Sequence, residues 1–265
     1  EENLGFAKAN NLGAKYANGE FLLFLNPDTM IIDDAIDLLA LRLPKLDGAG
    51  IVSGCLLNED GSKQLSCVRA FPTIFSEMFD SDFIIHNLPH LKMWGLSPLS
   101  RKSDVEMSVE VLSGACMLIR KDVFNQIGGF SDNYFMYSED VDLCLKAVSA
   151  GFKNYYISKP KIVHYGGGST KIRKKNFFSD IMITESRMRY FRKYRGEVYS
   201  VTFRFMIFCM SVVRLLLLFA ALPIKRLGSK DSYFDISVGK WWKKLRWSIG
   251  LEKWATRYPV SILDS

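Results

Sequence analysis

Acidic side chains gather at one point of the sequence where a helix is predicted to begin. Glu139, Asp140 and Asp142 follow an aromatic stretch, and apolar residues recur after them at helical spacing until Gly151. The helix macrodipole stabilises carboxylates at such a position, so this cluster alone has a purely structural explanation. A second acidic element, the NPD triplet at residues 26–28, ends another apolar run. Two carboxylate sites at the edges of core elements together suggest a metal ion and a base around one substrate.

The elements that position these residues alternate along the chain. Helical spacing occurs at residues 7–18, 33–46, 121–127 and from 139 onward, and apolar runs of strand length occur at 21–25, 50–53, 111–119, 154–157 and 161–164. Residues 58–110 mix turns, prolines and aromatics, which indicates a long, partly helical excursion. The alternation predicts an α/β domain with a largely parallel sheet. Ligands bind beyond the carboxyl ends of the strands in such sheets, and the NPD triplet follows one strand there.

Composition sets the broad class. The chain has 265 residues, 48% hydrophobic and 13% aromatic, which excludes general disorder and allows one substantial domain plus an appendage. The net charge of +7 is unevenly spread: residues 1–165 carry 15 Lys/Arg against 21 Asp/Glu, and residues 166–265 carry 20 against 7. We therefore expect an acidic, site-bearing part and a basic part that faces an anionic partner.

The cysteines indicate the redox compartment of the protein, and the first residues bear on where the chain begins. Five widely spaced cysteines without a CxxC pair argue against a disulfide framework or a zinc cluster and favour reduced thiols in the cytosol. The chain opens at Glu1 with neither a methionine nor a signal peptide, which suggests a cut N-terminus.

Three segments resemble family 2 glycosyltransferases, in the family's order and spacing: NLGFAKANNLGAKYANGEFLLFLNPDT, VLSGACMLIRKDVFNQIGGFSDNYFMYSEDVDLCLKAVSAGFK and VHYGGGST. The resemblance covers residues 1–170 and is closest to the rhamnosyltransferase-like branch of bacterial surface polysaccharide assembly. It implies a GT-A (Rossmann-like) domain with a mostly parallel sheet flanked by helices. It also implies a nucleotide-sugar donor, a divalent cation and inversion at the anomeric carbon. The family's first nucleotide-binding strands have no counterpart, so we expect a domain that is incomplete at its N-terminus.

The resemblance assigns chemical roles to the acidic residues. Asp140 is the expected base that takes the proton of the acceptor hydroxyl. Glu139 belongs with Asp140 to the expected catalytic motif, and Asp142 is expected to bind the acceptor. Glu139 and Asp142 could orient the acceptor, or else hold the start of the helix. Asp28 matches the last aspartate of a DxD-type motif in which Asn26 replaces the first, so it is the expected ligand of Mg²⁺ or Mn²⁺. The structural alternative for residues 26–29 is a simple turn in which Asp28 caps a helix.

Further residues take less specific roles. His164, before a run of glycines, is expected to complete the metal shell, although a lone histidine at a strand end is often simply packed. Asn10 and Asn11 lie in the family-like stretch that lines the donor site, together with Asn26 and Asp28. Arg69 lies in the excursion and is expected to meet a diphosphate on the acceptor, with a solvated surface arginine as the alternative.

The basic third of the chain suggests a membrane surface. Residues 203–222 are long enough to span a bilayer, but Arg204 and Arg214 interrupt them. At 100° per residue, polar residues in and beside this stretch share one narrow helical face: Ser200, Arg204, Ser211, Arg214 and Lys225. With the cations of residues 171–195 and the Trp/Lys segment 241–247, this predicts an amphipathic helix lying in the membrane interface. The alternative is a helix hairpin that caps the domain.

These expectations combine into one prediction. Residues 1–170 form a glycosyltransferase domain that uses a dTDP- or UDP-sugar and a glycan or polyprenyl-diphosphate-linked acceptor. Residues 171–265 form a membrane-associating region, which places the protein in the bacterial cytoplasm on the inner face of the membrane. A catalytically inactive remnant is the main alternative. A nucleic-acid-binding protein fits less well, because the site-bearing part is acidic and shows no RRM, helix-turn-helix or zinc pattern.

Overall fold

The computed structural model describes residues 3–80, 82–100, 104–166, 177–220 and 232–257. The chain folds into two compact units: unit 1 comprises Glu1–Asp132 and Glu139–Gly168, and unit 2 comprises Asn133–Ser138 and Ser169–Ser265. This division lies close to the predicted boundary at residue 170. The sequence did not indicate that the segment Asn133–Ser138 belongs to the C-terminal unit.

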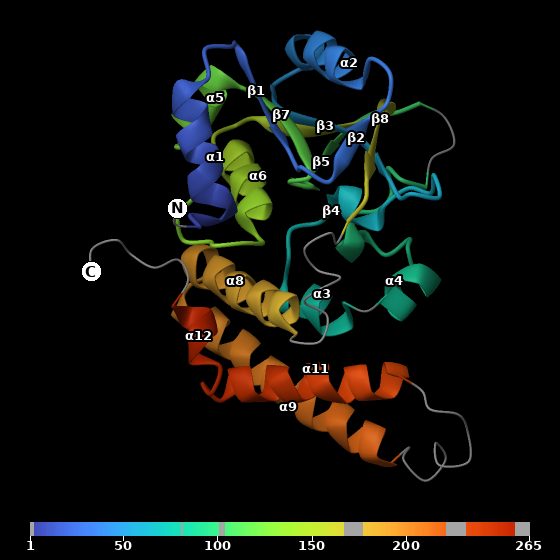
Figure 1. Ribbon diagram of the computed structural model, residues 1–265, viewed down its shortest axis with the longest axis vertical. Helices are drawn as coiled ribbons and strands as arrows, with labels where there is room; N and C mark the ends of the chain where they lie inside the picture. Colours follow the sequence, from blue (N-terminus) through green and yellow to red (C-terminus); the bar gives the residue numbers. More distant parts are fainter. Residues whose placement is uncertain (1–2, 81, 101–103, 167–176, 221–231, 258–265) are drawn as a thin grey trace. The chain divides into compact units, whose positions relative to one another are not determined.

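Unit 1 is a mixed α/β domain, as predicted. Its main sheet has the strand order β1-β7-β3-β8-β2, and β5 also pairs with β8 (Figure 1). The strands are β1 (Phe21–Leu25), β2 (Thr29–Ile31), β3 (Ala49–Leu57), β5 (Glu106–Val109), β7 (Cys116–Arg120) and β8 (Lys153–His164). A small second sheet pairs β4 (Val68–Arg69) with β6 (Val111–Leu112).

The predicted parallel character of the sheet is wrong. Among the described strands of the main sheet, only β3 and β8 run parallel, and the pairs β1–β7, β3–β7, β2–β8 and β5–β8 are antiparallel. The reason lies in the path of the chain after β3. The excursion of residues 58–110 brings the chain back so that β7 enters between β1 and β3 in the opposite direction, and no parallel crossover joins it to either neighbour.

Strand β8 replaces the two short strands that were predicted around Pro160. Its pairing with β3 shifts register after Ser53, which pairs with Tyr156, so that Cys55 next pairs with Lys161. The irregularity accommodates Pro160, which has no N–H for a regular ladder. Gly54 makes this possible, because a Cβ atom there would lie 2.7 Å from the Pro160 carbonyl oxygen.

The helices of unit 1 follow the predicted spacing closely. They are α1 (Gly5–Tyr16), α2 (Ala35–Arg42), α3 (Ile74–Phe79), α4 (Asp82–Asn87), α5 (Lys121–Gln126) and α6 (Glu139–Ser149), with 3-10 turns η1 (Leu43–Lys45), η2 (Leu65–Cys67) and η3 (Lys92–Trp94). All nine residues of β3 are buried, as expected for a central strand. Phe24 of β1 packs on Phe124 and Phe130, with ring centroids 5.1 and 4.8 Å away.

Unit 2 is helical, with α8 (Phe178–Arg195), α9 (Glu197–Ala220), α11 (Ser232–Ser248) and α12 (Lys253–Thr256). Its core contains Phe203, whose ring lies 5.0 Å from Phe191 and 6.4 Å from Trp247. The apolar helix predicted from residue 203 begins at Glu197. Its predicted end at residue 222, Lys225 and the cations of residues 171–175 lie outside the described residues.

Hydrogen bonds explain why residues 133–138 belong to unit 2. The hydroxyl of Ser186 donates to the carbonyl oxygen of Met136 at 2.8 Å, and the Arg189 guanidinium donates to that of Asn133 at 2.9 Å. Side chains of α8 thus donate hydrogen bonds to backbone carbonyls of residues 133–138, which lie in no helix or strand.

Candidate active site

Asp140 is held by backbone amides at the start of α6. Its Oδ2 atom accepts a hydrogen bond from the Gly114 N–H at 3.1 Å, and its Oδ1 atom accepts one from the Val141 N–H at 2.8 Å. Gly114 lies in the turn between β6 and β7, and a Cβ atom there would be 3.3 Å from the Asp140 Cβ. Glycine therefore lets the turn approach the carboxylate closely, and the predicted base is oriented by groups that cannot change rotamer.

Glu139 has a different environment from its neighbour. Its side chain is buried, and this burial, followed by the charge of Asp140 and then that of Asp142, raises the pKa of Glu139 to about 8. Its Oε2 atom has no hydrogen-bond partner among the described residues. At neutral pH Glu139 is therefore protonated, and it adds no second negative charge beside Asp140.

The backbone before α6 is strained. Tyr137 and Ser138 have φ angles of 71° and 65°, a left-handed conformation that costs a residue with a side chain about 1–3 kcal/mol. Such strain occurs most often at functional sites.

The expectation that Asp142 contacts an acceptor is corrected by the structure. The Asp142 side chain has no exposed surface, so no ligand reaches it in this conformation. Its Oδ2 atom accepts a hydrogen bond from the Ser131 hydroxyl at 2.6 Å and lies 4.0 Å from the Lys146 ammonium. Asp142 thus takes the alternative role, in which it holds the start of the helix.

Asp28 and His164 meet where β2 pairs with β8. Thr29 is the register partner of His164, and the Tyr165 N–H donates to the Asp28 carbonyl oxygen at 2.9 Å. The His164 Nε2 atom lies 3.4 Å from the Asp28 Oδ1 atom. The structure therefore brings together the two residues that were predicted as metal ligands from opposite ends of the domain sequence.

Asn26 connects this pair to the predicted base. The Asn26 N–H donates to the Ala115 carbonyl oxygen at 3.0 Å, and Ala115 follows Gly114, which holds Asp140. The Thr29 hydroxyl donates to the Asn26 carbonyl oxygen at 2.7 Å and closes the NPDT turn. The metal-ligand candidates and the candidate base thus lie around the same ends of β1 and β7.

Gln64 is a site residue that the sequence did not reveal. Its Nε2 amide donates to the backbone carbonyl of His164 at 2.6 Å, which leaves its Oε1 atom as the acceptor 3.0 Å from the His164 Nδ1 atom. In the neutral imidazole the proton is therefore on Nδ1, and the lone pair of Nε2 faces Asp28. No spacing links a glutamine in a turn-rich stretch to a histidine 100 residues later.

This donor set fits a divalent cation. A carboxylate oxygen and an imidazole lone pair repel each other at 3.4 Å unless a proton or a cation lies near both. Their separation is close to the roughly 3 Å between neighbouring ligands of an octahedral Mg²⁺. In the part of the chain that the structure describes, no group of three or more His, Cys, Asp or Glu is arranged so that it could hold a metal ion. A cation held by Asp28 and His164 would therefore need further ligands, such as diphosphate oxygens.

The other predicted residues lie apart from this site or have structural partners. The Asn11 amide donates to the Phe130 carbonyl at 2.8 Å and accepts from the Phe130 N–H at 2.9 Å, which ties α1 to that loop. Asn10 donates to the carbonyl of Phe6, within α1. Their roles in donor binding stay predictions, and residues 167–170 of the glycine run lie outside the described residues.

Arg69 belongs to a groove that Asp140 does not line. This groove of about 350 Å³ is also lined by Glu110, Lys153 and Val148. Val148 lies eight residues after Asp140 in α6, which places it roughly 12 Å farther along the helix. The acceptor role of Arg69 stays a prediction, for a groove at the other end of α6.

Comparison with known proteins decides the family. The family model described as "Glycosyltransferase like family 2" matches residues 5–185. The chain belongs to this family. Rhamnosyltransferase WbbL of Escherichia coli (strain K12) is 32% identical to this family 2 chain over 171 residues, which cover 61% of each protein. The N-acetylglucosaminyl-diphospho-decaprenol L-rhamnosyltransferase of Mycobacterium tuberculosis (strain H37Rv) is 29% identical over 160 residues, which cover 57% of this chain and 48% of that protein.

The chain thus spans about half to three fifths of the length of these curated relatives. Among solved structures, the mannosyltransferase PcManGT from Pyrobaculum calidifontis, in complex with GDP-Man and Mn²⁺, aligns with a TM-score of 0.49 at 12% identity, over 97% of this chain and 68% of that one.

Proposed function

We propose that this family 2 chain carries the catalytic site of an inverting glycosyltransferase that moves a sugar, most favourably rhamnose, from a nucleotide sugar to a saccharide or lipid-linked acceptor. The observation that carries the proposal is the junction at Gly114 and Ala115. It holds Asp140 on one side and the turn of Asp28 on the other. The names of the two relatives support the sugar, and that of the mycobacterial protein supports a polyprenyl-diphosphate acceptor.

Each residue has a defined task in this reaction. Asp140 accepts the proton of the attacking acceptor hydroxyl, and inversion needs only this one base. Glu139 is protonated and therefore places no second negative charge next to Asp140, the proposed base. Asp28 and His164 would hold a Mg²⁺ or Mn²⁺ ion, which when bound neutralises the charge that develops on the leaving diphosphate.

The base assignment is tested by Asp140→Asn. Transfer from dTDP-rhamnose or UDP-sugars to a polyprenyl-diphosphate N-acetylglucosamine acceptor should fall about 10²-fold or more, because the amide takes no proton. Nucleotide affinity should change little. The control is Asp122→Asn, which alters an exposed carboxylate paired with Arg120. Turnover close to that of the control would remove Asp140 from the mechanism.

The metal assignment is tested separately by Asp28→Ala. Calorimetry should show that Mn²⁺ strengthens binding of a nucleoside diphosphate to the unmodified chain and that the variant loses this gain. Equal affinity with and without Mn²⁺ in both proteins would contradict the assignment. Metal-dependent binding without any donor-dependent transfer would instead favour the inactive remnant.

The setting of the reaction follows from the acceptor. A sugar carrier anchored by a polyprenyl chain stays in the bilayer, so we propose that transfer occurs at the inner face of the bacterial cytoplasmic membrane.

A further inference from the structure

Helix α9 turns several of its polar residues toward the other helices of unit 2. Ser200 and Ser211 have no exposed surface, and the Arg204 guanidinium donates to the carbonyl oxygens of Ser248 and Trp247 at 2.9 and 3.0 Å. The opposite side of α9 carries large apolar side chains that are 36–82% exposed, and we call them the outward face: Val198, Val201, Phe205, Phe208, Val213, Leu216 and Phe219. A helix in contact with water has the reverse arrangement.

The outward face is too apolar to be an ordinary soluble surface. The most apolar 18-residue window of α9 has a mean hydropathy of 2.1, and α9 is the one helix of the described residues long and apolar enough to cross a membrane. The core helix of a soluble protein has a similar composition but is mostly buried, whereas only 28% of this window is buried. Contiguous apolar surface of this kind marks a site of contact with a partner or a membrane.

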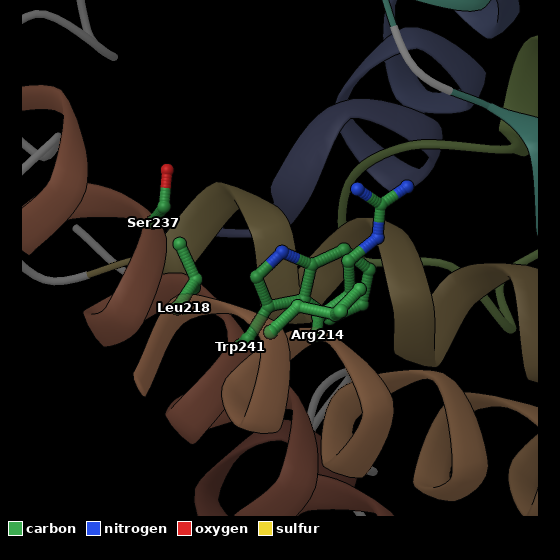
Figure 2. Close-up of a pocket in the computed structure, with 5 residues that line it drawn as sticks. Arg214, Leu218, Ser237 and Trp241 are labelled. Carbon is green, nitrogen blue, oxygen red and sulfur yellow. The ribbon is translucent and has the colours of Figure 1, made fainter. Parts of the chain in front are cut away.

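The inward side of α9 makes a bilayer crossing unfavourable. Within unit 2, α9 packs against both α8 and α11. Figure 2 shows Arg214 beside the indole of Trp241, and the guanidinium carbon is 5.7 Å from the ring centroid. These two residues help to line a hollow of about 190 Å³ between α9 and α11. A crossing would take these helices and their charges into the hydrocarbon core, which is costly.

Charge favours an anionic bilayer over a second copy of this chain. The described stretches 177–220 and 232–257 contain 13 Lys/Arg against 5 Asp/Glu. Two such units would repel each other if their outward faces met. Anionic head groups attract the same cations, by about 1 kcal/mol for each one near the surface.

We propose that the outward face of α9 is a membrane-docking surface that lies in the head-group region of a bilayer containing anionic lipid. Unit 2 would then attach peripherally, with one side of one helix buried and its cations at the lipid surface. This inference does not depend on the catalytic roles proposed for unit 1.

Cys209 provides a probe at the centre of this surface without any substitution. It lies four residues after Phe205 and four before Val213, on the same side of the helix, and it is exposed while the other four cysteines are buried. An environment-sensitive fluorophore attached to Cys209 should brighten and shift to the blue on vesicles containing phosphatidylglycerol, and much less on pure phosphatidylcholine. Quenchers placed at known depths should locate it about 5–10 Å below the head groups.

A matched pair of double variants tests the side chains. Phe205→Glu with Leu216→Glu should weaken co-sedimentation with anionic vesicles at least about tenfold, because two apolar anchors become charged. Phe75→Glu with Leu41→Glu is the control, because these residues of unit 1 are similarly exposed, at 60% and 54% against 64% and 63%. The control should bind vesicles like the unmodified chain.

Three results would overturn the proposal. An unchanged spectrum and no sedimentation with vesicles would show that the surface does not meet lipid. Strongest quenching at the bilayer midplane, together with resistance to high salt and alkaline carbonate, would show a transmembrane helix. A dimer in solution that dissociates on Phe205→Glu with Leu216→Glu, without vesicle binding, would show that a second copy covers the face.

Discussion

Two adjacent carboxyl groups in the candidate site lie in different environments. Asp140 receives two backbone N–H donors, while Glu139 is buried and carries a raised pKa. A pair of titratable groups whose environments differ in this way is typical of acid–base sites. The raised pKa of Glu139 also has a testable effect on stability.

We expect Glu139→Gln to change how stability depends on pH. The folded chain keeps the Glu139 proton up to a pKa of about 8, whereas the unfolded chain loses it near the ordinary value of 4.5. Stability from the neutral carboxyl is thus full below pH 4.5 and is lost as the pH rises to about 8, by up to roughly 1.4 kcal/mol per pH unit.

The glutamine variant cannot ionise at this position. Its unfolding free energy should therefore rise relative to that of the unmodified chain between pH 4.5 and about 8. Urea denaturation at a series of pH values measures the difference. A difference that stays constant with pH would contradict the raised pKa.

We expect Gln64→Leu to weaken metal binding at the proposed site of Asp28 and His164, although Gln64 is not itself a proposed ligand. The change removes the acceptor that fixes the His164 proton on Nδ1, and loss of such a partner typically lowers metal affinity 10- to 100-fold, about 1.4–2.7 kcal/mol. Electron paramagnetic resonance of free Mn²⁺, titrated with the chain and a nucleoside diphosphate, measures it. Asn58→Leu is the control, since Asn58 is an exposed amide that bonds to Ser62. Equal Mn²⁺ affinity in the two variants would argue against a role for Gln64.

At this scale the sequence identified residues with short, local signals and missed those defined by tertiary contact. Asp140 and Asp28 end or begin elements, so pattern and resemblance both marked them. The contact of Gln64 joins it to a residue 100 positions later, and Asp142 bonds to Ser131 in the loop before α6, which has no periodic pattern. The sequence carried the residue types of these contacts but not their partners.

At the scale of elements, Gly54 shows how one position lets two strands pair. It sits in the central strand β3 at the register shift opposite Pro160, and a Cβ atom would also lie 2.6 Å from the Ile162 Cδ1 atom. Neither a backbone carbonyl nor a buried isoleucine moves easily in a packed sheet.

We therefore expect Gly54→Ala to lower the unfolding free energy by roughly 2–4 kcal/mol. Gly13→Ala is the control, because its Cβ would meet nothing within 4 Å on helix α1. It should be neutral or stabilise by up to about 1 kcal/mol. Guanidinium denaturation measures both, and equal effects would show that β3 tolerates the extra methyl group.

Elements with their own periodicity were predictable, and relations between elements were not. The run FLLFL became β1 with its predicted bounds, and α6 begins at the acidic cluster as predicted. Strands β2, β4 and β5 were missed because they have two to four residues, too few for a period to show. The direction of β7 was missed because it depends on the route of the preceding excursion.

At the scale of the whole molecule, the chain contains separate natural probes for its two units. The four buried cysteines all belong to unit 1, and four of the five tryptophans belong to unit 2. Reactivity of buried thiols therefore reports opening of unit 1, and tryptophan fluorescence mainly reports unit 2. Two compact units with their own cores can unfold in separate steps.

We expect each unit to respond to its own substitution. Gly54→Ala should move the thiol-exposure transition to lower denaturant and leave the fluorescence transition in place. Arg204→Met should do the opposite, because it removes two charged hydrogen bonds between α9 and α11, worth about 1.5–3 kcal/mol each. Coincident shifts of both probes in both variants would show a single cooperative unit.

The contact between Gly114 and Asp140 bears on how the site can change through mutation. The partner that orients this carboxylate is a peptide N–H, and every residue except proline supplies one. Codon changes at position 114 therefore act through bulk and not through the loss of a donor. Sequences that evolve from this one can change in the turn as long as the residue at position 114 stays small. Among the described residues both hydrogen-bond partners of Asp140 are backbone N–H groups, so an engineer who wants to change its environment has to move the loop itself.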